Sequence, residues 1–195
     1  MPSPHEIIAS PLTLWLAEVG TTYPDLDEAP ASEWKLLGAE GPRNYDEDGV
    51  EVDYSQTIET FRGQSTTIRK VFRTEEGMAM TFTLVDLSPE MQALAAFDDA
   101  TITTVAAAAG VAGEKNFSTK KGPIVAQYAL LARGESTVDN GLITQHEWPT
   151  VYQSGEPAPV HTKDSPAGLE LEYTAIEVTE GEFGDTRIQT AEPTS

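Results

Sequence analysis

The side chains best suited to catalysis or metal binding are few and scattered along this sequence of 195 residues. The three histidines, His5, His146 and His161, show no i, i+4 spacing, so zinc-type ligation has no support. We expect His146 to lie on a strand face in a structural role. Cysteine is absent, which excludes disulfides, thiolate nucleophiles and thiolate metal sites.

A short acidic run, Asp46-Glu47-Asp48-Gly49, has some features of a calcium-binding loop. No ladder of ligands precedes Asp48, however, and Gly49 is out of place for the twelve-residue calcium pattern. We therefore interpret the run as a solvated acidic turn within a long polar loop over residues 38–49.

Sequence signatures of enzymes are also missing. The GxSxG, phosphate-loop and GxGxxG patterns do not occur, and Gly110-Val111-Ala112-Gly113 lacks the Lys-Ser/Thr ending of a phosphate loop. Carboxylate pairs arise by chance among 32 acidic residues, so they do not indicate a glycosidase. We expect neither catalysis nor a bound cofactor.

The charge balance limits the partners. Against the 32 acidic residues stand 12 basic ones, a formal net charge of −20. Such a surface repels nucleic acid and disfavours anionic membranes. No Lys or Arg precedes Lys35 and no apolar run approaches the roughly 18 residues of a membrane helix, so neither a signal peptide nor a membrane span is expected.

Strands dominate the elements that the sequence predicts. The clearest alternation covers residues 50–59, and its period of two predicts one packed face and one acidic face. The expected packed face contains the even-numbered residues Val50, Val52, Tyr54 and Ile58. The odd-numbered residues, called the acidic parity here, form the other face: Glu51, Asp53, Ser55, Thr57 and Glu59. Further strands are expected at residues 12–17, 34–37, 66–74, 78–85, 102–105, 124–132, 142–148 and 169–173.

Basic residues gather in two places. One group surrounds a turn expected at residues 63–65, where cross-strand pairs with Glu51, Asp53 and Glu59 are possible. The other is a lysine spot too small for a nucleic-acid site. In an acidic protein that self-associates, basic residues are useful contacts with a neighbouring subunit. The candidate inter-subunit contacts are Arg69, Lys70, Arg73, Lys115, Lys120 and Lys121.

One helix is expected in the middle of the chain, since Ser88 suits the N-cap, Pro89 the first helical position and Glu90 the positive helix end. We expect it to end near residue 98 or 99. An Asn140-Gly141 turn precedes the strand at residues 142–148. With no internal repeat and no linker, we expect one β-sandwich domain with long loops over residues 1–180. Residues 181–195 are expected to be a flexible acidic tail or arm.

Several segments of the first half together resemble the major tail tube proteins of bacteriophages with long, non-contractile tails. They are ASPLTLWLAEVGTTYPDLDEAP (residues 9–30), WKLLG (34–38), NYDEDGVEV (44–52), QTIETFR (56–62) and FRTEEGMAMTFTLVDLSPE (72–90). The resemblance covers residues 7–97 well and the rest only in general layout.

The resemblance implies a mainly β fold, a β-sandwich or barrel with one flanking helix, whose strands join those of neighbours into a shared inner β-barrel. It implies hexameric rings stacked into a tube around a tape-measure protein, with tail-tip and terminator proteins as further partners. The tube would be assembled in the host bacterial cytoplasm, become part of the virion tail and conduct genomic DNA during ejection.

On this hypothesis the acidic parity of residues 51–59 faces the bore or a ring interface, where repeated rings of charge keep DNA from sticking. Two other interpretations stay open. One is a different virion β-sandwich protein, such as a tail terminator or capsid decoration subunit. The other is a soluble carbohydrate-binding β-sandwich, which would need exposed aromatic residues, whereas Trp15, Trp34 and Trp148 look like packing residues.

Overall fold

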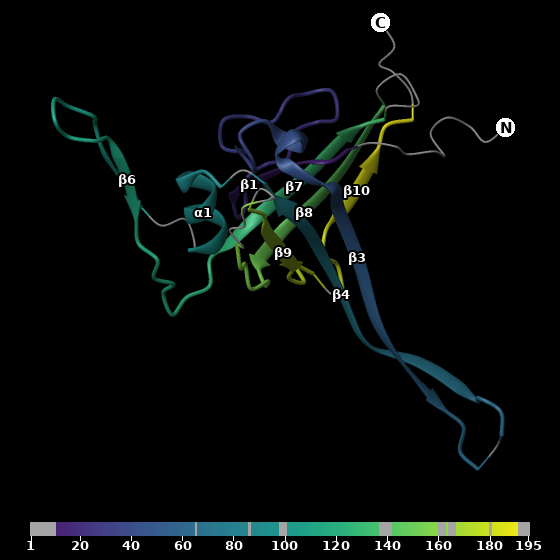
Figure 1. Cartoon of the computed structure of the whole chain (residues 1–195). Helices are drawn as coiled ribbons and strands as arrows, with labels where there is room; N and C mark the ends of the chain where they lie inside the picture. The colour runs from purple at the N-terminus through teal and green to yellow at the C-terminus, as the bar shows by residue number, and fades with distance from the viewer. Residues whose placement is uncertain are drawn as a thin grey trace, which may run out of the picture.

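The computed structural model describes residues 11–64, 66–85, 87–97, 101–136, 142–159, 163, 167–179 and 181–190. In these residues the chain is mainly β with one short α-helix, which confirms the predicted fold class (Figure 1). The main sheet contains β1 (Thr13–Glu18), β2 (Lys35–Leu36), β3 (Tyr45–Phe61), β4 (Lys70–Leu84), β7 (Gln127–Glu135), β8 (Ile143–Gln153), β9 (Leu169–Ala175) and β10 (Asp185–Ile188). The other elements are α1 (Pro89–Ala96), a 3-10 turn (Gly41–Asn44), and a separate hairpin of β5 (Ile102–Val105) and β6 (Glu114–Phe117).

The main sheet is antiparallel in the order β2-β1-β7-β8-β9-β4-β3. One edge of β8 pairs with β7, so its other edge is shared in succession by β10, at residues 144–147, and by β9, at residues 151–153. The sheet divides at this point. One half then packs against the other like the two layers of a sandwich.

A single apolar core lies between these two halves. Leu14 and Leu16 of β1 and Trp148 of β8 belong to the same buried cluster as Phe82 of β4 and Tyr173 of β9. The alternation of these strands explains the arrangement, since every second side chain enters the core and its neighbours point outward. A smaller cluster of Ala17, Trp34, Ala129 and Leu131 lies on the outer face, where residues 21–34 cover β1 and β7.

The α-helix begins where the sequence predicts. Ser88 Oγ accepts a hydrogen bond from the backbone N–H of Met91 at 3.4 Å, and Pro89 occupies the first turn. The helix ends at Ala96, slightly before the predicted residue 98 or 99. Its Leu94 is buried against the core, so α1 closes one end of the sandwich.

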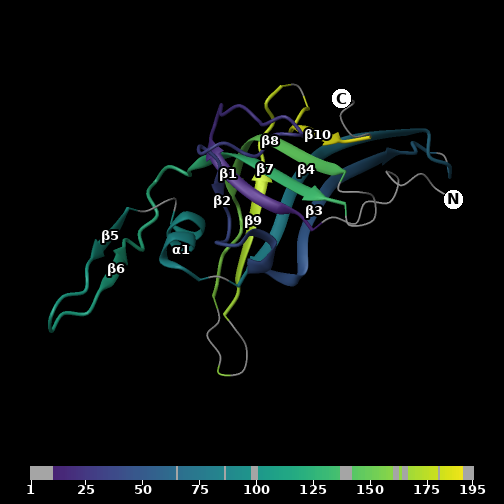
Figure 2. The same ribbon diagram turned by 90° about the horizontal axis from the view of Figure 1, so that it is seen from above.

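The most unusual feature is the length of β3 and β4, which pair from Val50↔Phe82 to Phe61↔Lys70. β9 pairs with β4 only at residues 79–84. Beyond that point the described residues of β3 and β4 form a two-stranded ribbon that leaves the body (Figures 1 and 2). The β5–β6 hairpin projects on the opposite side of the body in both views.

Several predicted boundaries in this region are wrong. Residues 45–49 are part of β3 and not of a loop, because the buried Tyr45 hydroxyl fixes the chain there: it donates to Leu37 O at 2.9 Å and accepts from Leu14 N at 3.0 Å. The predicted strands at residues 66–74 and 78–85 are one strand, β4. Gly77 interrupts the apolar pattern but not the ladder, since it pairs with Ser55.

Two corrections concern the second half. The strand expected at residues 124–132 begins at Gln127, and Ile124 is 81% exposed. Part of the expected acidic arm is a strand of the sheet, because Asp185–Ile188 form β10 on β8. The predicted turn at residues 140–141 and the end of the arm at residues 191–195 lie outside the described residues.

Candidate self-association surfaces

The predicted acidic parity forms one face of the β3–β4 ribbon. Ladder pairing places Thr81 opposite Glu51, Ala79 opposite Asp53 and Glu75 opposite Thr57, and directly opposed residues share a face. β9 adds Glu172 opposite Thr81 and Glu170 opposite Thr83. The resulting acidic face contains Glu51, Asp53, Glu59, Glu75, Glu170 and Glu172, together with the neutral Ser55 and Thr57.

The opposite face of the ribbon is packed only near the body. Val50 and Val52 lie against the core, whereas Tyr54 is 59% exposed and Ile58 is 50% exposed. The prediction of a packed face is therefore wrong beyond Val52. The alternation continues past the point where a second layer exists to cover it, which is a property that the pattern alone cannot reveal.

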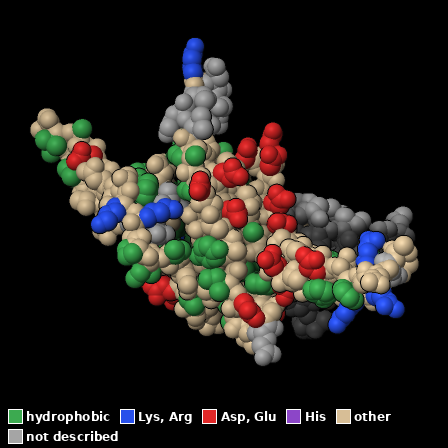
Figure 3. All heavy atoms as spheres, turned by 90° about the horizontal axis from the view of Figure 1, so that it is seen from below, with side chains coloured by type: hydrophobic (Ala, Val, Ile, Leu, Met, Phe, Trp, Pro, Cys, Tyr) green, Lys and Arg blue, Asp and Glu red, His purple; other side chains and the backbone are tan. Residues whose placement is uncertain are grey.

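The tip of the ribbon differs in charge from the rest of the molecule. Between Thr60 and Thr74 there is no Asp or Glu, and this stretch carries four of the 12 basic residues: Arg62, Arg69, Lys70 and Arg73. On the face seen in Figure 3, acidic side chains spread over the body and most basic ones lie on the two projecting hairpins. The tip also exposes apolar side chains, with Phe61 57%, Val71 57% and Phe72 46% exposed.

The predicted cross-strand pairing of this basic group with Glu51, Asp53 and Glu59 does not match the ladder. Glu59 lies opposite Phe72, and Lys70 lies opposite Phe61. Arg73 instead forms an ion pair with Glu76 at 2.8 Å and donates to Gln56 Oε1 at 3.1 Å. The acidic face and the basic tip thus follow one another along the same face of the ribbon and meet at Glu59, whose diagonal neighbour is Lys70.

The predicted lysine spot lies on and after the β5–β6 hairpin. Lys115 forms an ion pair with Glu90 of α1, and Phe117 contacts the Phe97 ring with centroids 5.7 Å apart, so these contacts attach the hairpin to the helix. Lys121 lies 3.4 Å from Gln153 Oε1, and Lys120 is exposed. Lys115 and Lys121 are therefore engaged within the chain, while Lys120 is exposed to solvent.

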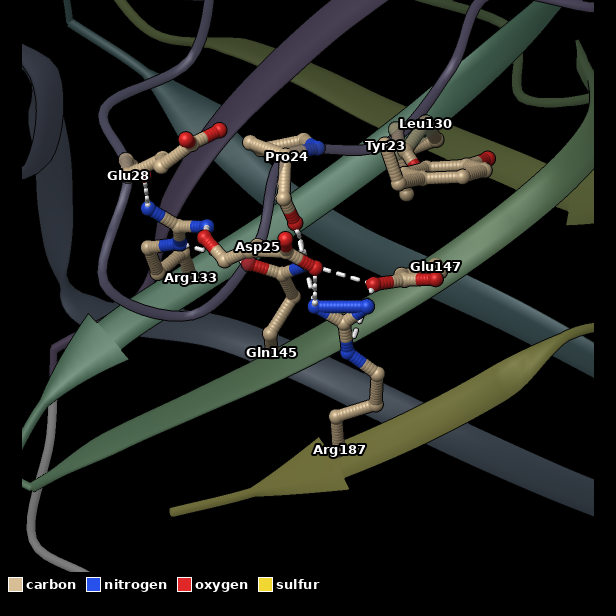
Figure 4. A network of polar contacts seen from close by, with 9 residues as sticks. All are labelled: Tyr23, Pro24, Asp25, Glu28, Leu130, Arg133, Gln145, Glu147 and Arg187. Carbon is tan, nitrogen blue, oxygen red and sulfur yellow. Dashed lines mark hydrogen bonds and ion pairs between the residues drawn. The ribbon is translucent and has the colours of Figure 1, made fainter. Parts of the chain in front are cut away.

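Sequence reasoning missed a polar network beneath residues 24–28 (Figure 4). Arg133 of β7 donates to Asp25 O at 2.8 Å, to Glu28 O and to Gln145 Oε1. Arg187 of β10 donates to Pro24 O at 3.1 Å. Polar residues within the apolar stretches of β7 and β8 are the signal that could have indicated this network, because buried polar groups need partners.

The network has electrostatic consequences. Burial, and secondarily the positive charge of Arg187, lowers the pKa of the Arg133 guanidinium from its usual value. Glu147 is only 8% exposed and accepts a hydrogen bond from Gln145. Two guanidinium groups and the Gln145 amide thus donate to backbone carbonyls of the 24–28 segment, while the Glu147 carboxylate contacts Gln145 and Arg187 and so holds two of these donors in place. The arrangement ties the segment to three strands of the sheet.

The structure offers little for catalysis or metal binding among the described residues. His146 is half-buried on β8, as predicted for its strand position; its Nδ1 lies 2.9 Å from Thr186 Oγ1, and burial lowers its pKa. No group of three or more His, Asp or Glu side chains in the described part could hold a metal ion. Asp46 and Asp48 are exposed on β3. His5 and His161 lie outside the described residues.

No helix in the described part of the chain is both long and apolar enough to span a membrane. Comparison with protein-family models finds no match, and comparison with curated protein sequences finds none either. The resemblance to tail tube proteins therefore stays a prediction.

Proposed function

We propose that this protein is a structural subunit that polymerises as stacked hexameric rings to form a bacteriophage tail tube, a conduit for genomic DNA. In this role it acts without catalysis or cofactor. Its partners are further copies of itself, a tape-measure protein inside the tube, and the tail-tip and terminator proteins at the tube's ends.

The observation that carries the proposal is the unsupported β3–β4 ribbon. A two-stranded hairpin is only marginally stable alone in water. Apolar side chains that stay exposed on it add no burial energy, and contiguous exposed apolar patches commonly mark interaction sites. The ribbon nevertheless extends well past β9 with Tyr54, Ile58, Phe61, Val71 and Phe72 exposed. Such a ribbon is expected to be completed by a neighbouring molecule, and continuous pairing between subunits would also protect its open edges.

The acidic face of β3, β4 and β9 is suited to line a channel through which DNA passes. If the outer faces of β3, β4 and β9 surround a channel, each ring repeats Glu51, Asp53, Glu170 and Glu172 once per subunit. Repeated negative charge repels DNA phosphates, so DNA slides through the channel without binding its wall. Ring closure of the three strands around a channel is part of the proposal.

The alternatives make different predictions about assembly. A terminator or decoration subunit would form single rings or remain a monomer until it meets a virion. A carbohydrate-binding module would expose aromatic residues over a flat face. Here Trp34 and Trp148 are 6% and 1% exposed, and Trp15 packs against the outer cluster. The exposed aromatic residues Tyr54, Phe61 and Phe72 lie on a projecting two-stranded ribbon instead of a flat face, which does not favour that alternative.

The proposal is tested by sedimentation velocity of the purified protein at rising concentrations. We expect ring-sized and larger species to replace the monomer. A matched control replaces residues 58–74 with Asn-Gly, because Thr57 and Glu75 are paired and a two-residue turn can join them. This variant should keep the urea stability of the parent and remain a monomer. A parent that stays monomeric at every concentration, or a shortened variant that assembles equally well, would contradict the proposal.

A further inference from the structure

The body of the molecule contains a partly open cavity of about 540 Å³ that no role has yet been given. It lies where the end of β1 meets the start of β7 and helix α1. Leu16, Ala17, Leu94 and Tyr128 provide apolar lining, and Glu18, Glu33 and Lys35 stand among the residues around them. Val19, which also lines it, is 49% exposed.

The cavity is too large for one side chain and suits a group of side chains. Its volume falls within the range of about 300–1,000 Å³ that is typical of ligand pockets. The apolar lining disfavours a strongly charged small ligand, and the two carboxylates outnumber the single lysine. An occupant with apolar groups flanked by positive charge therefore fits it best.

The tip of the β3–β4 ribbon has this composition. Phe72 lies opposite Glu59 and Phe61 lies opposite Lys70, so the two phenylalanines are diagonal neighbours on one face. Diagonal neighbours on a sheet are about 7–8 Å apart, close enough for aromatic side chains to act as one apolar unit. Lys70 shares this face with Glu59, which lies at its inner end opposite Phe72. Beyond Glu59, Arg62 and Arg69 lie at the turn without any acidic residue between Thr60 and Thr74, so the outer end of the tip is positively charged.

The positions of the two surfaces favour contact between molecules. The cavity adjoins α1, whereas the ribbon tip lies on the far side of the body in two perpendicular views (Figures 1 and 2). A tip cannot fold back into the cavity of its own chain from there. A contact between a protruding element at one end and a cavity at the other is heterologous, and it generates rings or open stacks instead of closed two-fold dimers.

We propose that this cavity receives the Phe61–Phe72 face of the ribbon tip of a second copy of the protein. Phe61 and Phe72 enter against Leu16, Leu94 and Tyr128. Lys70 approaches the carboxylates of Glu18 and Glu33. This inference rests on the proposed self-association and specifies which surface of the body takes part in it.

The absence of cysteine from the chain allows a direct test by disulfide trapping. Val19→Cys protein is mixed with affinity-tagged Phe72→Cys protein, and formation of the mixed disulfide under mild oxidation is followed over time. In the control, the same Phe72→Cys protein is mixed with Val178→Cys protein. Val178 is 50% exposed, so its accessibility matches that of Val19. Docking should make the first pair react at least about tenfold faster, because it raises the effective concentration of the two thiols. Equal rates for both pairs would overturn the inference.

A charge exchange provides a second readout. Lys70→Glu and Glu33→Lys should each weaken association in sedimentation, and the two variants mixed together should associate more strongly than either alone. Failure of the mixture to recover would count against the inference. If the protein forms rings or tubes but the two cysteine pairs react at equal rates, the proposed contact is wrong and the proposed function stands. If the Val19–Phe72 pair is trapped selectively but no rings or tubes form, the contact is right and the tail-tube function is wrong.

Discussion

Arg187 on β10 forms an ion pair with Glu147 on β8, with 3.1 Å between Nε and Oε1. The Nε–H is not aligned with the carboxylate oxygen, so the contact is electrostatic and not a well-directed hydrogen bond. The same guanidinium donates to Pro24 O at 3.1 Å. Two segments far apart in the sequence, the 24–28 segment and the final strand, are thereby held on the same outer face of the sheet.

Replacing Arg187→Ala should destabilise the protein. The change leaves the buried Glu147 carboxylate without its cationic partner. The Arg187 side chain is 34% exposed, so we expect a loss of about 1–3 kcal/mol instead of the roughly 3–5 kcal/mol for breaking a fully buried pair. Urea unfolding measures the difference. Arg43→Ala is the control, since the Arg43–Glu40 pair is exposed and 3.9 Å apart; similar effects of the two changes would contradict this account.

Gly184→Ala should detach β10. Gly184 has φ +153°, and a Cβ there would overlap the carbonyl oxygen of Glu147 and lie 2.9 Å from Trp148 Cδ1. Because that carbonyl belongs to β8, it cannot move without disturbing the sheet, and we expect a loss of about 2–3 kcal/mol. Faster hydrogen exchange in residues 185–188 would identify the released strand. Gly122→Ala, where the nearest atom is 4.0 Å away, should be close to neutral.

His146 should make stability depend on pH. Burial lowers its folded-state pKa below the unfolded value of about 6.5, so the unfolded state binds the proton more readily. The contribution of the neutral side chain is present above that value and is lost as the pH falls from it toward the folded pKa. Urea unfolding at pH 7.5 and at pH values below 6.5 should show a smaller change in stability for His146→Gln than for the parent. An identical change in both proteins would mean that His146 does not contribute.

The acidic face can be tested through DNA binding by assembled protein. Glu51→Lys combined with Asp53→Lys converts repulsion of phosphates into attraction, because both side chains are exposed on one face. Assemblies of this variant should retain double-stranded DNA at low salt and release it at high salt, while the parent retains none. Asp27→Lys combined with Glu135→Lys, also exposed, is the control. If assemblies of the control variant retain DNA and those of the Glu51→Lys, Asp53→Lys variant do not, the acidic face does not line the bore.

Much of the fold follows from local patterns in the sequence. The alternation at residues 50–59 placed Glu51 and Asp53 on one face, and the cap at Ser88 located the helix start. Both features depend on neighbouring residues, which is why a pattern predicts them. The strand at β9 was predicted for the same reason.

Other features depend on contacts between distant segments. Tyr54 and Ile58 continue an apolar alternation, but whether a second layer covers them is decided by where β9 ends. The pairing of β10 with β8 joins Asp185–Ile188 to residues 144–147. The use of Arg133 and Arg187 to bind residues 24–28 joins segments more than 100 residues apart. The cavity beside α1 likewise requires the packed arrangement of β1, β7 and the helix.

Negative-stain electron microscopy of the purified full chain at high concentration tests self-polymerisation most directly. The account predicts rings or tubes about 100 Å wide, roughly the width that six domains of this size would make. The variant with residues 58–74 replaced should form neither under the same conditions. Fields containing only isolated particles of monomer size for the parent protein would contradict the central claim.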